Sequence, residues 1–218
     1  MTDAYIVGAV RSAGGKKNGR LSKIHPIDLG AEVVDALVAK TGVAVSEIDD
    51  LIFGCVSQVG AQSSNIARNI CLSSVLGEVV PGTTVDRQCG SGQQAMHFAA
   101  QGVLSGTQDL VIAGGVESMS QVPIGANIID GYKAEHGLPY GKKMSERYPG
   151  VQFNQFAGAE MLAHKYELTQ NELNAFAFDS HVKAKRAVLE GRFKDEIVAI
   201  QIELEDGTTE SHEQDEGI

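Results

Sequence analysis

The sequence predicts an α/β protein in which a mostly parallel sheet is covered by helices. Short apolar runs alternate with helix-periodic runs over residues 1–117, which is the pattern of strand–helix units. The apolar runs do not alternate with polar residues, as expected for strands covered on both faces. The composition, 43% hydrophobic and 21% charged, is that of an ordinary globular domain.

The first half of the chain divides into strands and helices at glycines, prolines and changes of period. Pro26 precedes an apolar-periodic run, and Gly42 ends it. A helix is therefore expected between them, after a buried strand that ends in a glycine-rich loop. Continuing in this way, we expect strands at 4–10, 51–56, 83–86 and 110–113, and helices at 27–40, 65–76 and 92–104.

The second half is organised differently. Residues 117–153 are rich in glycine, proline and single charges and hold no period, which predicts an irregular stretch that is a functional loop or an insertion. Thr169 and Glu172 form a capping-box pattern that opens a helix running to about residue 190. A strand is expected at 197–204. The acidic residues 210–218 show no pattern of a helix or strand, so no closing element of secondary structure is expected there. We therefore expect an α/β domain at 1–117 and a loop domain at 118–218.

Charge and cysteine content exclude several function classes. The net charge of −10 disfavours nucleic acid as a partner. No run of about 18 apolar residues and no leader pattern occurs, so no membrane segment is expected. Three widely spaced cysteines without a Cys-x-x-Cys or His-Glu-x-x-His motif predict neither disulfides nor a metal site. A reducing, cytoplasmic location fits this pattern.

The stretch from Thr83 to Ala95 carries the strongest chemical signal. A strand ends, a glycine-rich turn follows and a helix begins, which places Cys89 at or just before a helix N-terminus. The unpaired N–H groups and the helix dipole favour a thiolate there. Cys89 is therefore the candidate nucleophile.

A helix terminus alone is too weak to activate a thiol. Lowering an ordinary thiol pKa from about 8.5 to about 7 takes roughly 2 kcal/mol, whereas a helix terminus supplies about 0.3–1 kcal/mol. A base or cation must therefore assist. His97 is eight residues further along the same predicted helix, about 12 Å away along the axis at ~1.5 Å per residue, so it is not that partner.

Other interpretations of these residues stay open. A lone cysteine is commonly a small buried apolar residue, and this is the interpretation we adopt for Cys55 and Cys71. Residues 90–95 also match a short dinucleotide-binding fingerprint, with Glu117 as its roughly placed acidic residue. The basic group at residues 183–186 is either a solvated helix face or a contact for coenzyme A phosphates.

The sequence resembles the thiolase family from end to end. The carriers of this resemblance are Val85-Asp-Arg-Gln-Cys89-Gly-Ser-Gly-Gln-Gln-Ala, Asn65-Ile-Ala-Arg-Asn, Val111-Ile-Ala-Gly-Gly-Val-Glu-Ser-Met-Ser, Gly158-Ala-Glu-Met-Leu-Ala and Asp195-Glu-Ile-Val. The resemblance implies one half of the duplicated thiolase fold, with the helical loop domain inserted. Two positions depart from the family pattern. Asp86 stands where many members carry Asn, and the region of Asn154 and Gln155 lacks a common His-Met pair.

The resemblance also implies an activity, with Cys89 forming an acyl-enzyme from an acyl-coenzyme A. Reversible Claisen condensation or thiolysis of a 3-ketoacyl-coenzyme A follows, as in acetyl-CoA acetyltransferases. Coenzyme A thioesters are then substrates, no separate cofactor is needed, and a homo-oligomer is expected.

The family's second half supplies a catalytic His, a second Cys and part of the oxyanion hole. No Gly-His-Pro and no late Cys-x-Gly occurs in these 218 residues. The partner expected for this chain is therefore a C-terminal thiolase half or a second polypeptide. The alternatives are an inactive fragment, a non-catalytic binding or assembly subunit and, more distantly, a dinucleotide-binding oxidoreductase.

Overall fold

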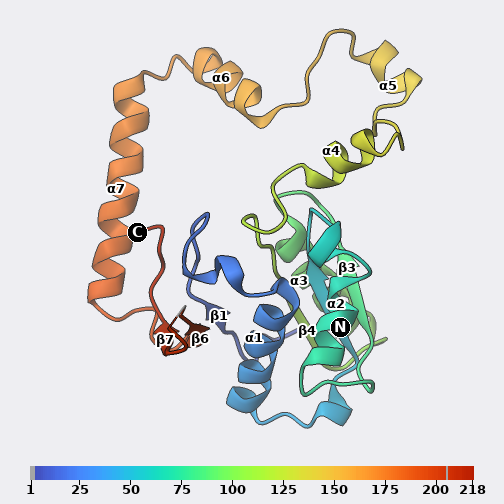
Figure 1. Cartoon of the computed structure of the whole chain (residues 1–218), viewed down its shortest axis with the longest axis vertical. Helices are drawn as coiled ribbons and strands as arrows, with labels where there is room; N and C mark the ends of the chain where they lie inside the picture. Colours follow the sequence, from blue (N-terminus) through green and yellow to red (C-terminus); the bar gives the residue numbers. More distant parts are fainter. Residues whose placement is uncertain (1–2, 205) are drawn as a thin grey trace. The chain divides into compact units, whose positions relative to one another are not determined.

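The computed structural model describes residues 3–204 and 206–218, which form two compact units. The first unit runs to Asp130 and also includes Asp195–Gly217, and the second comprises Gly131–Lys194 and Ile218 (Figure 1). These units differ from the expected division at residue 117. The chain leaves the first unit after Asp130 and returns to it at Asp195, so a boundary drawn along the sequence does not follow the packing.

The first unit is built on a three-stranded parallel sheet. Its strands are β2 (Asp50–Gly54), β3 (Gly82–Val85) and β4 (Val111–Gly115), in the order β3-β2-β4. In the register of the sheet, Leu51 lies beside Gly82 on one side and Ile112 on the other. The carboxyl ends of all three strands therefore meet at one edge of the sheet, as predicted for strand–helix units.

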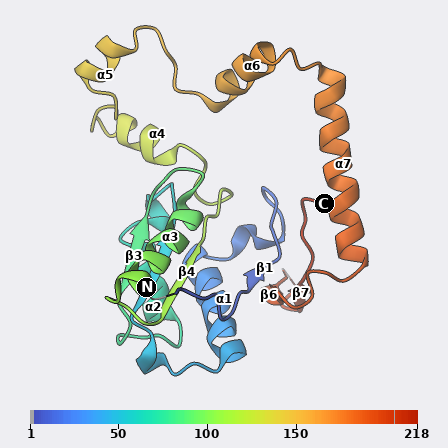
Figure 2. The same cartoon turned by 180° about the vertical axis from the view of Figure 1, so that it is seen from behind.

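Helices cover both faces of this sheet. On one face, α1 (Pro26–Thr41) and α2 (Ile66–Ser73) enclose the larger core, in which Val34 and Ile70 pack with Leu51. On the other face, α3 (Ser91–Ser105) packs Ala95 and Ala99 against Ile52. Seen from behind, α3 lies against β3 and β4 (Figure 2). The predicted two-sided covering of the strands is confirmed.

Local signals fix the helix ends. Pro26 opens α1, His25 Nδ1 accepts the Ile27 N–H, and Gly42 ends the helix in the left-handed conformation at φ 68°. Asn65 caps α2 by accepting the Arg68 N–H. Short 3-10 turns complete the connections at Arg20–Lys23, Val45–Glu47 and Gly60–Gln62.

The expected strand at 4–10 is wrong. These residues form no strand, and Tyr5, Ile6 and Val7 are 78%, 74% and 69% exposed. The first strand, β1 (Arg11–Ser12), lies further along and pairs in parallel with β5 (Ile197–Val198). A strand needs a neighbour to accept its backbone hydrogen bonds, and no described strand lies beside residues 4–10.

The C-terminal residues are also better anchored than the sequence indicates. The expected strand at 197–204 is split into β5 and β6 (Ile200–Glu203), and β6 forms an antiparallel pair with β7 (Thr209–His212). Beyond β7, the Asp215 Oδ1 accepts one hydrogen bond from the Arg11 Nη1 and one from the Gly14 N–H, both at 2.6 Å. The expectation that residues 210–218 lack a closing element is therefore wrong.

The second unit consists of helices and connecting segments. α4 (Ala126–Lys133) leads into it, followed by α5 (Lys142–Arg147), α6 (Gln155–Lys165) and α7 (Gln170–Leu189). The expectation of an irregular stretch over 117–153 is wrong, because α4 and α5 lie within it. The capping box of Thr169 and Glu172 at the start of α7 is confirmed. Among the described residues, no helix has the length and apolar character of a membrane span.

Candidate active site

The candidate nucleophile lies at the carboxyl edge of the parallel sheet. Strand β3 ends at Val85, and α3 begins at Ser91. Cys89 lies in the turn between them, two residues before the helix, and is exposed to solvent. The structure thus places this residue in the strand–turn–helix context predicted from the sequence.

Hydrogen bonds from Ser91 close the turn on either side of Cys89. The Ser91 Oγ accepts the Arg87 N–H at 3.0 Å and donates to the Gln88 carbonyl at 2.7 Å. The Ser91 N–H also donates to the Gln88 carbonyl at 3.2 Å, and the Gly90 N–H donates to the Arg87 carbonyl at 3.0 Å. The residues just before Cys89 are therefore tied to the residues just after it.

Gln88, immediately before Cys89, adopts a left-handed backbone conformation with φ 46°. This conformation costs a non-glycine residue of order 1–3 kcal/mol and persists where the surroundings hold it. Here the Asp86 Oδ1 accepts the Gln88 N–H at 2.7 Å, and the Gln88 side-chain Nε2 lies 3.4 and 3.3 Å from the two Asp86 oxygens. Asp86, which departs from the common Asn, thus has a local role in shaping the turn.

A glycine at the end of β2 lets α3 start directly on the sheet. A Cβ at Gly54 would lie 2.4 Å from the Ser91 carbonyl carbon and from the Gly92 nitrogen. Real Cβ atoms do not approach backbone so closely, so any larger residue at position 54 would displace the start of α3. The position of the turn is therefore set by the neighbouring strand β2 as well as by β3.

A buried polar network ties the ends of β2 and β4 together behind this turn. The Glu117 carboxylate accepts the Ser57 N–H at 3.0 Å. Gln62 is fully buried; it donates to the Ser57 carbonyl at 2.9 Å and accepts the Ser118 N–H at 2.7 Å. These bonds fix the loops that follow two strands at the same edge of the sheet.

The three cysteines differ sharply in environment. Cys55 and Cys71 are 1% and 0% exposed, whereas Cys89 is exposed. Burial, followed by the charges of Glu117 and Asp86, raises the pKa of Cys55 to about 12, and burial also raises the pKa of Cys71. The structural interpretation of Cys55 and Cys71 is confirmed, and Cys89 is the one exposed cysteine of the three.

The geometry does not favour the dinucleotide interpretation. In that fingerprint the glycine-rich turn receives a pyrophosphate, and the acidic residue contacts a ribose. Here the Gly92 backbone lies against Gly54 of the sheet, and the Glu117 carboxylate is engaged by the Ser57 N–H. Among the described residues, no group of three or more His, Cys, Asp or Glu side chains is arranged to hold a metal ion.

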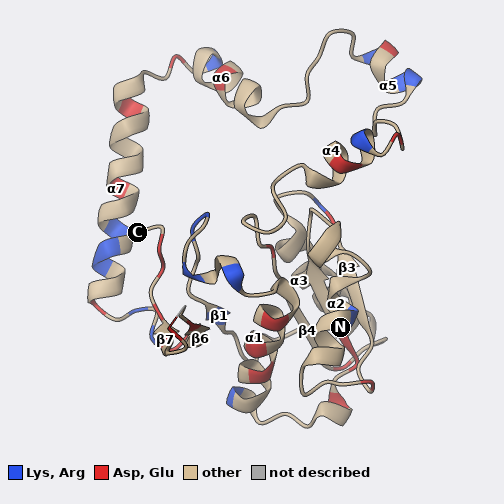
Figure 3. Cartoon of the chain, in the orientation of Figure 1, with Lys and Arg blue, Asp and Glu red and all other residues tan. Residues whose placement is uncertain are grey.

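The second unit contains the basic group considered for coenzyme A. Lys183, Lys185 and Arg186 are exposed and lie near the C-terminal end of α7, where Figure 3 shows basic residues. Lys183 pairs with Asp179 at 2.5 Å. An ion pair between exposed side chains four residues apart is typical of a solvated helix face.

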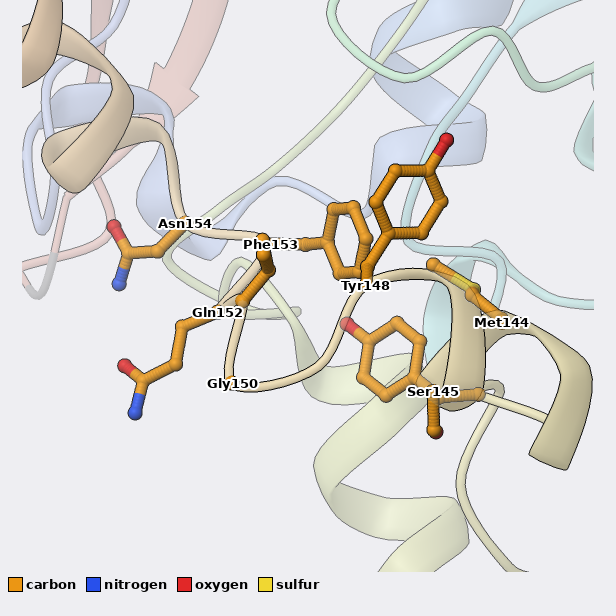
Figure 4. Close-up of a pocket in the computed structure, with 9 residues that line it drawn as sticks. Met144, Ser145, Tyr148, Gly150, Gln152, Phe153 and Asn154 are labelled. Carbon is orange, nitrogen blue, oxygen red and sulfur yellow. The ribbon is translucent and has the colours of Figure 1, made fainter.

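A pocket of about 410 Å³ lies in the segment around α5. The ring of Phe153 stacks on Tyr140 with centroids 6.0 Å apart and meets the Tyr148 ring edge-on at 5.7 Å. Gln152 and Asn154 point away from these rings (Figure 4). No sequence pattern indicates this pocket, because its aromatic residues follow no helical or strand period.

Two further residues of the site were missed in the sequence. In the sequence, Ser91 is part of the Cys-Gly-Ser-Gly motif and Gly54 is part of an apolar strand. A polar residue at the first position of a helix, next to a candidate nucleophile, was an available signal for Ser91. No signal was available for Gly54, because its partner backbone lies in another element.

Comparisons with known proteins agree on one family. The family model described as "Thiolase, N-terminal domain" matches residues 4–218. A steroid 3-ketoacyl-CoA thiolase of Mycobacterium tuberculosis is 42% identical over 205 residues, which is 93% of this chain and 50% of that protein. A 3-ketoacyl-CoA thiolase of Bacillus subtilis is 39% identical over 203 residues, 93% of this chain and 50% of that protein.

The fold agrees as well. The crystal structure of the acetyl-CoA acetyltransferase of Bacillus anthracis matches with a TM-score of 0.83 at 32% identity, covering 99% of this chain and 55% of that one. The chain spans about half the length of the curated relatives it matches.

Proposed function

This chain belongs to the thiolase family, and on that premise we propose that Cys89 is the nucleophile of acyl transfer from coenzyme A thioesters. The observation that carries the proposal is the solvent-exposed thiol in a braced turn before α3, while the other two cysteines are buried. The unpaired N–H groups at the start of a helix favour negative charge on the sulfur or on a reacting oxygen.

The proposed reaction has two transfers. In the thiolysis direction, the Cys89 thiolate attacks the 3-keto carbonyl of a 3-ketoacyl-coenzyme A. The bond between carbons 2 and 3 breaks, acetyl-coenzyme A leaves as its carbanion equivalent and takes up a proton, and the acyl group stays on sulfur. The thiol of free coenzyme A then attacks this thioester, loses its proton to a base and releases the Cys89 thiolate. Reversing these steps gives Claisen condensation.

The groups that move these protons are proposed to come from a second thiolase half. Within the described residues, no side chain forms a hydrogen bond or an ion pair with the Cys89 thiol. His97 lies within α3, His25 caps α1, and the ring of His212 is 2% exposed and 3.2 Å from the Ala13 carbonyl. We propose that a C-terminal half or second polypeptide completes the site, that the assembly is a homo-oligomer, and that it works in the cytoplasm.

The test is to trap the acyl-enzyme. The protein is incubated with acetyl-coenzyme A or acetoacetyl-coenzyme A in a mildly alkaline buffer, whose basic component can take up a proton in place of a protein base. Mass spectrometry of the acid-quenched protein and its peptides should show one acyl group, on Cys89. Cys89→Ser should abolish this adduct, and Cys71→Ser, the matched change at a buried thiol, should leave it intact.

The same experiment separates the competing function. If Cys89 reacts with iodoacetamide but takes no acyl group from either thioester, the proposed nucleophilic role is wrong. A non-catalytic binding or assembly subunit would then be the better description of this chain.

A further inference from the structure

We propose that Ser91 is a positioning residue, whose hydroxyl holds the turn that presents Cys89. The inference rests on the proposed nucleophilic role of Cys89, because the turn matters for chemistry only if that thiol reacts. Ser91 is 6% exposed, and its Oγ accepts the Arg87 N–H at 3.0 Å while donating to the Gln88 carbonyl at 2.7 Å. Among small side chains, a hydroxyl can accept and donate at one atom, and an alanine methyl can do neither.

One of the two bonds acts on Gln88, the residue immediately before Cys89, and the other acts on Arg87. Gln88 is left-handed at φ 46°, and its N–H side is already fixed by the Asp86 carboxylate at 2.7 Å. Its carbonyl side is fixed by Ser91. Without the hydroxyl, the Gln88 carbonyl keeps only the hydrogen bond from the Ser91 N–H, and the Arg87 N–H loses Ser91 Oγ as its acceptor. Gln88 is then free to relax toward the ordinary conformation and to turn Cys89 away from the helix N-terminus.

Ser91 is itself held by the sheet. The position of a Cβ on Gly54 would lie 2.4 Å from the Ser91 carbonyl carbon, so the Ser91 backbone rests directly on the end of β2. The Ser91 hydroxyl therefore connects the turn to a rigid part of the fold, because β2 is the central strand of the sheet. Geometry held in this way is what a reacting group needs from its surroundings.

The test compares Ser91→Ala with Ser105→Ala. Ser105 ends the same helix, and its exposed Oγ donates to the Gly102 carbonyl at 2.9 Å, so the same atoms are removed far from the turn. The measurement is the rate of Cys89 alkylation by iodoacetamide near pH 7.5, followed by peptide mass spectrometry. A helix N-terminus favours the thiolate by about 0.3–1 kcal/mol, which converts to roughly a two- to fivefold rate.

We expect Cys89 to react about two- to fivefold more slowly in Ser91→Ala and at the wild-type rate in Ser105→Ala. Cys55 and Cys71, at 1% and 0% exposure, serve as internal reporters of unfolding and should stay unlabelled in both variants. An unchanged or faster Cys89 rate in Ser91→Ala overturns the proposal. Labelling of Cys55 and Cys71 together with Cys89 also overturns it, because the serine would then only stabilise the unit.

A second measurement covers the case in which Ser91→Ala does not fold. In the wild-type protein, hydrogen exchange of the Arg87 amide should be slowed well below that of an exposed loop amide, because Ser91 Oγ accepts it. Exchange at the rate of an exposed loop would show that this bond does not hold the turn, and the proposal would fail. Neither measurement depends on catalysis, so a failure of the Ser91 proposal can be told apart from a failure of the acyl-enzyme test.

Discussion

Replacing Gly54 with alanine should dislodge the start of α3 from the sheet. The new Cβ would lie 2.4 Å from the Ser91 carbonyl carbon and the Gly92 nitrogen, whereas carbon atoms in normal contact are about 3.5–4.0 Å apart. The helix start must therefore move by about 1 Å or more. Both neighbours are backbone, so no side-chain rotation relieves the contact. Overpacking of this kind typically costs about 1–3 kcal/mol, and we expect a value in the upper part of that range.

Unfolding of the first unit is best followed through Cys71, which is fully buried at 0% exposure. Pulse labelling of this thiol across a urea series reports when α2 and the core open. With a urea dependence of about 1–3 kcal/mol per molar, a loss of about 2 kcal/mol lowers the midpoint by roughly 1 M. Gly92→Ala is the matched control, because its Cβ would meet only the Gly114 carbonyl oxygen, at an ordinary 3.8 Å.

The control should be neutral or more stable by up to about 1 kcal/mol, since alanine is the better residue within a helix. If Gly54→Ala unfolds at the same urea concentration as the wild type, the seating of α3 on Gly54 is refuted. If both variants lower the urea midpoint equally, an added methyl group near the first turn of α3 is destabilising at either position. The specific role assigned to Gly54 would then also be wrong.

Three further outcomes follow from the structure. Limiting iodoacetamide should label Cys89 first, because Cys55 and Cys71 are buried and burial raises their pKa values, to about 12 for Cys55; peptide mapping that finds either of these first contradicts the site. Asp215→Asn should lower the free energy of unfolding at pH 7 by about 1–3 kcal/mol, with exposed Glu213→Gln as the control. Hydrogen bonds from Arg11 hold the pKa of Asp215 below its usual value. The stability that the Asp215 carboxylate contributes is therefore complete above about pH 4 and is lost as the pH falls further. If urea titrations show that Asp215→Asn lowers the free energy of unfolding equally at pH 3 and pH 7, the charge of Asp215 is ruled out as the source of this stability. The chain should self-associate, because Tyr5, Ile6 and Val7 leave an apolar segment in water, whereas a single monomeric species at every concentration in the analytical ultracentrifuge would count against it.

Much of the fold was accessible from the sequence because the signals are local. Pro26 and Gly42 bound α1, and Thr169 with Glu172 caps α7, since helix ends are satisfied by residues within a few positions. The apolar runs that became β2, β3 and β4 were also found. The sequence predicts Cys89 just before a helix, because a strand, a glycine-rich turn and a helical period follow one another directly in the chain.

Pairing partners, in contrast, were decided by the tertiary structure. Residues 4–10 have the composition of a strand, yet they lack a neighbouring strand among the described residues and stay exposed. Residues 195–217 return to the first unit, where β5 pairs with β1 and Asp215 meets Arg11 across 204 positions of sequence. The sequence records which residues prefer an extended backbone, but not which distant segment offers the matching hydrogen bonds.

The candidate site divides in the same way. The sequence determined the candidate nucleophile, because its motif is contiguous from Thr83 to Ala95 and its place before a helix follows from local order. The tertiary structure decided how that nucleophile is held. Gly54 comes from another strand, and the hydroxyl of Ser91 matters only because Gln88 is left-handed in the folded turn. Close packing and hydrogen-bond geometry exist only once the elements meet, so Gly54 carried no sign of its role in the linear chain, and Ser91 carried only its polar character beside the candidate nucleophile.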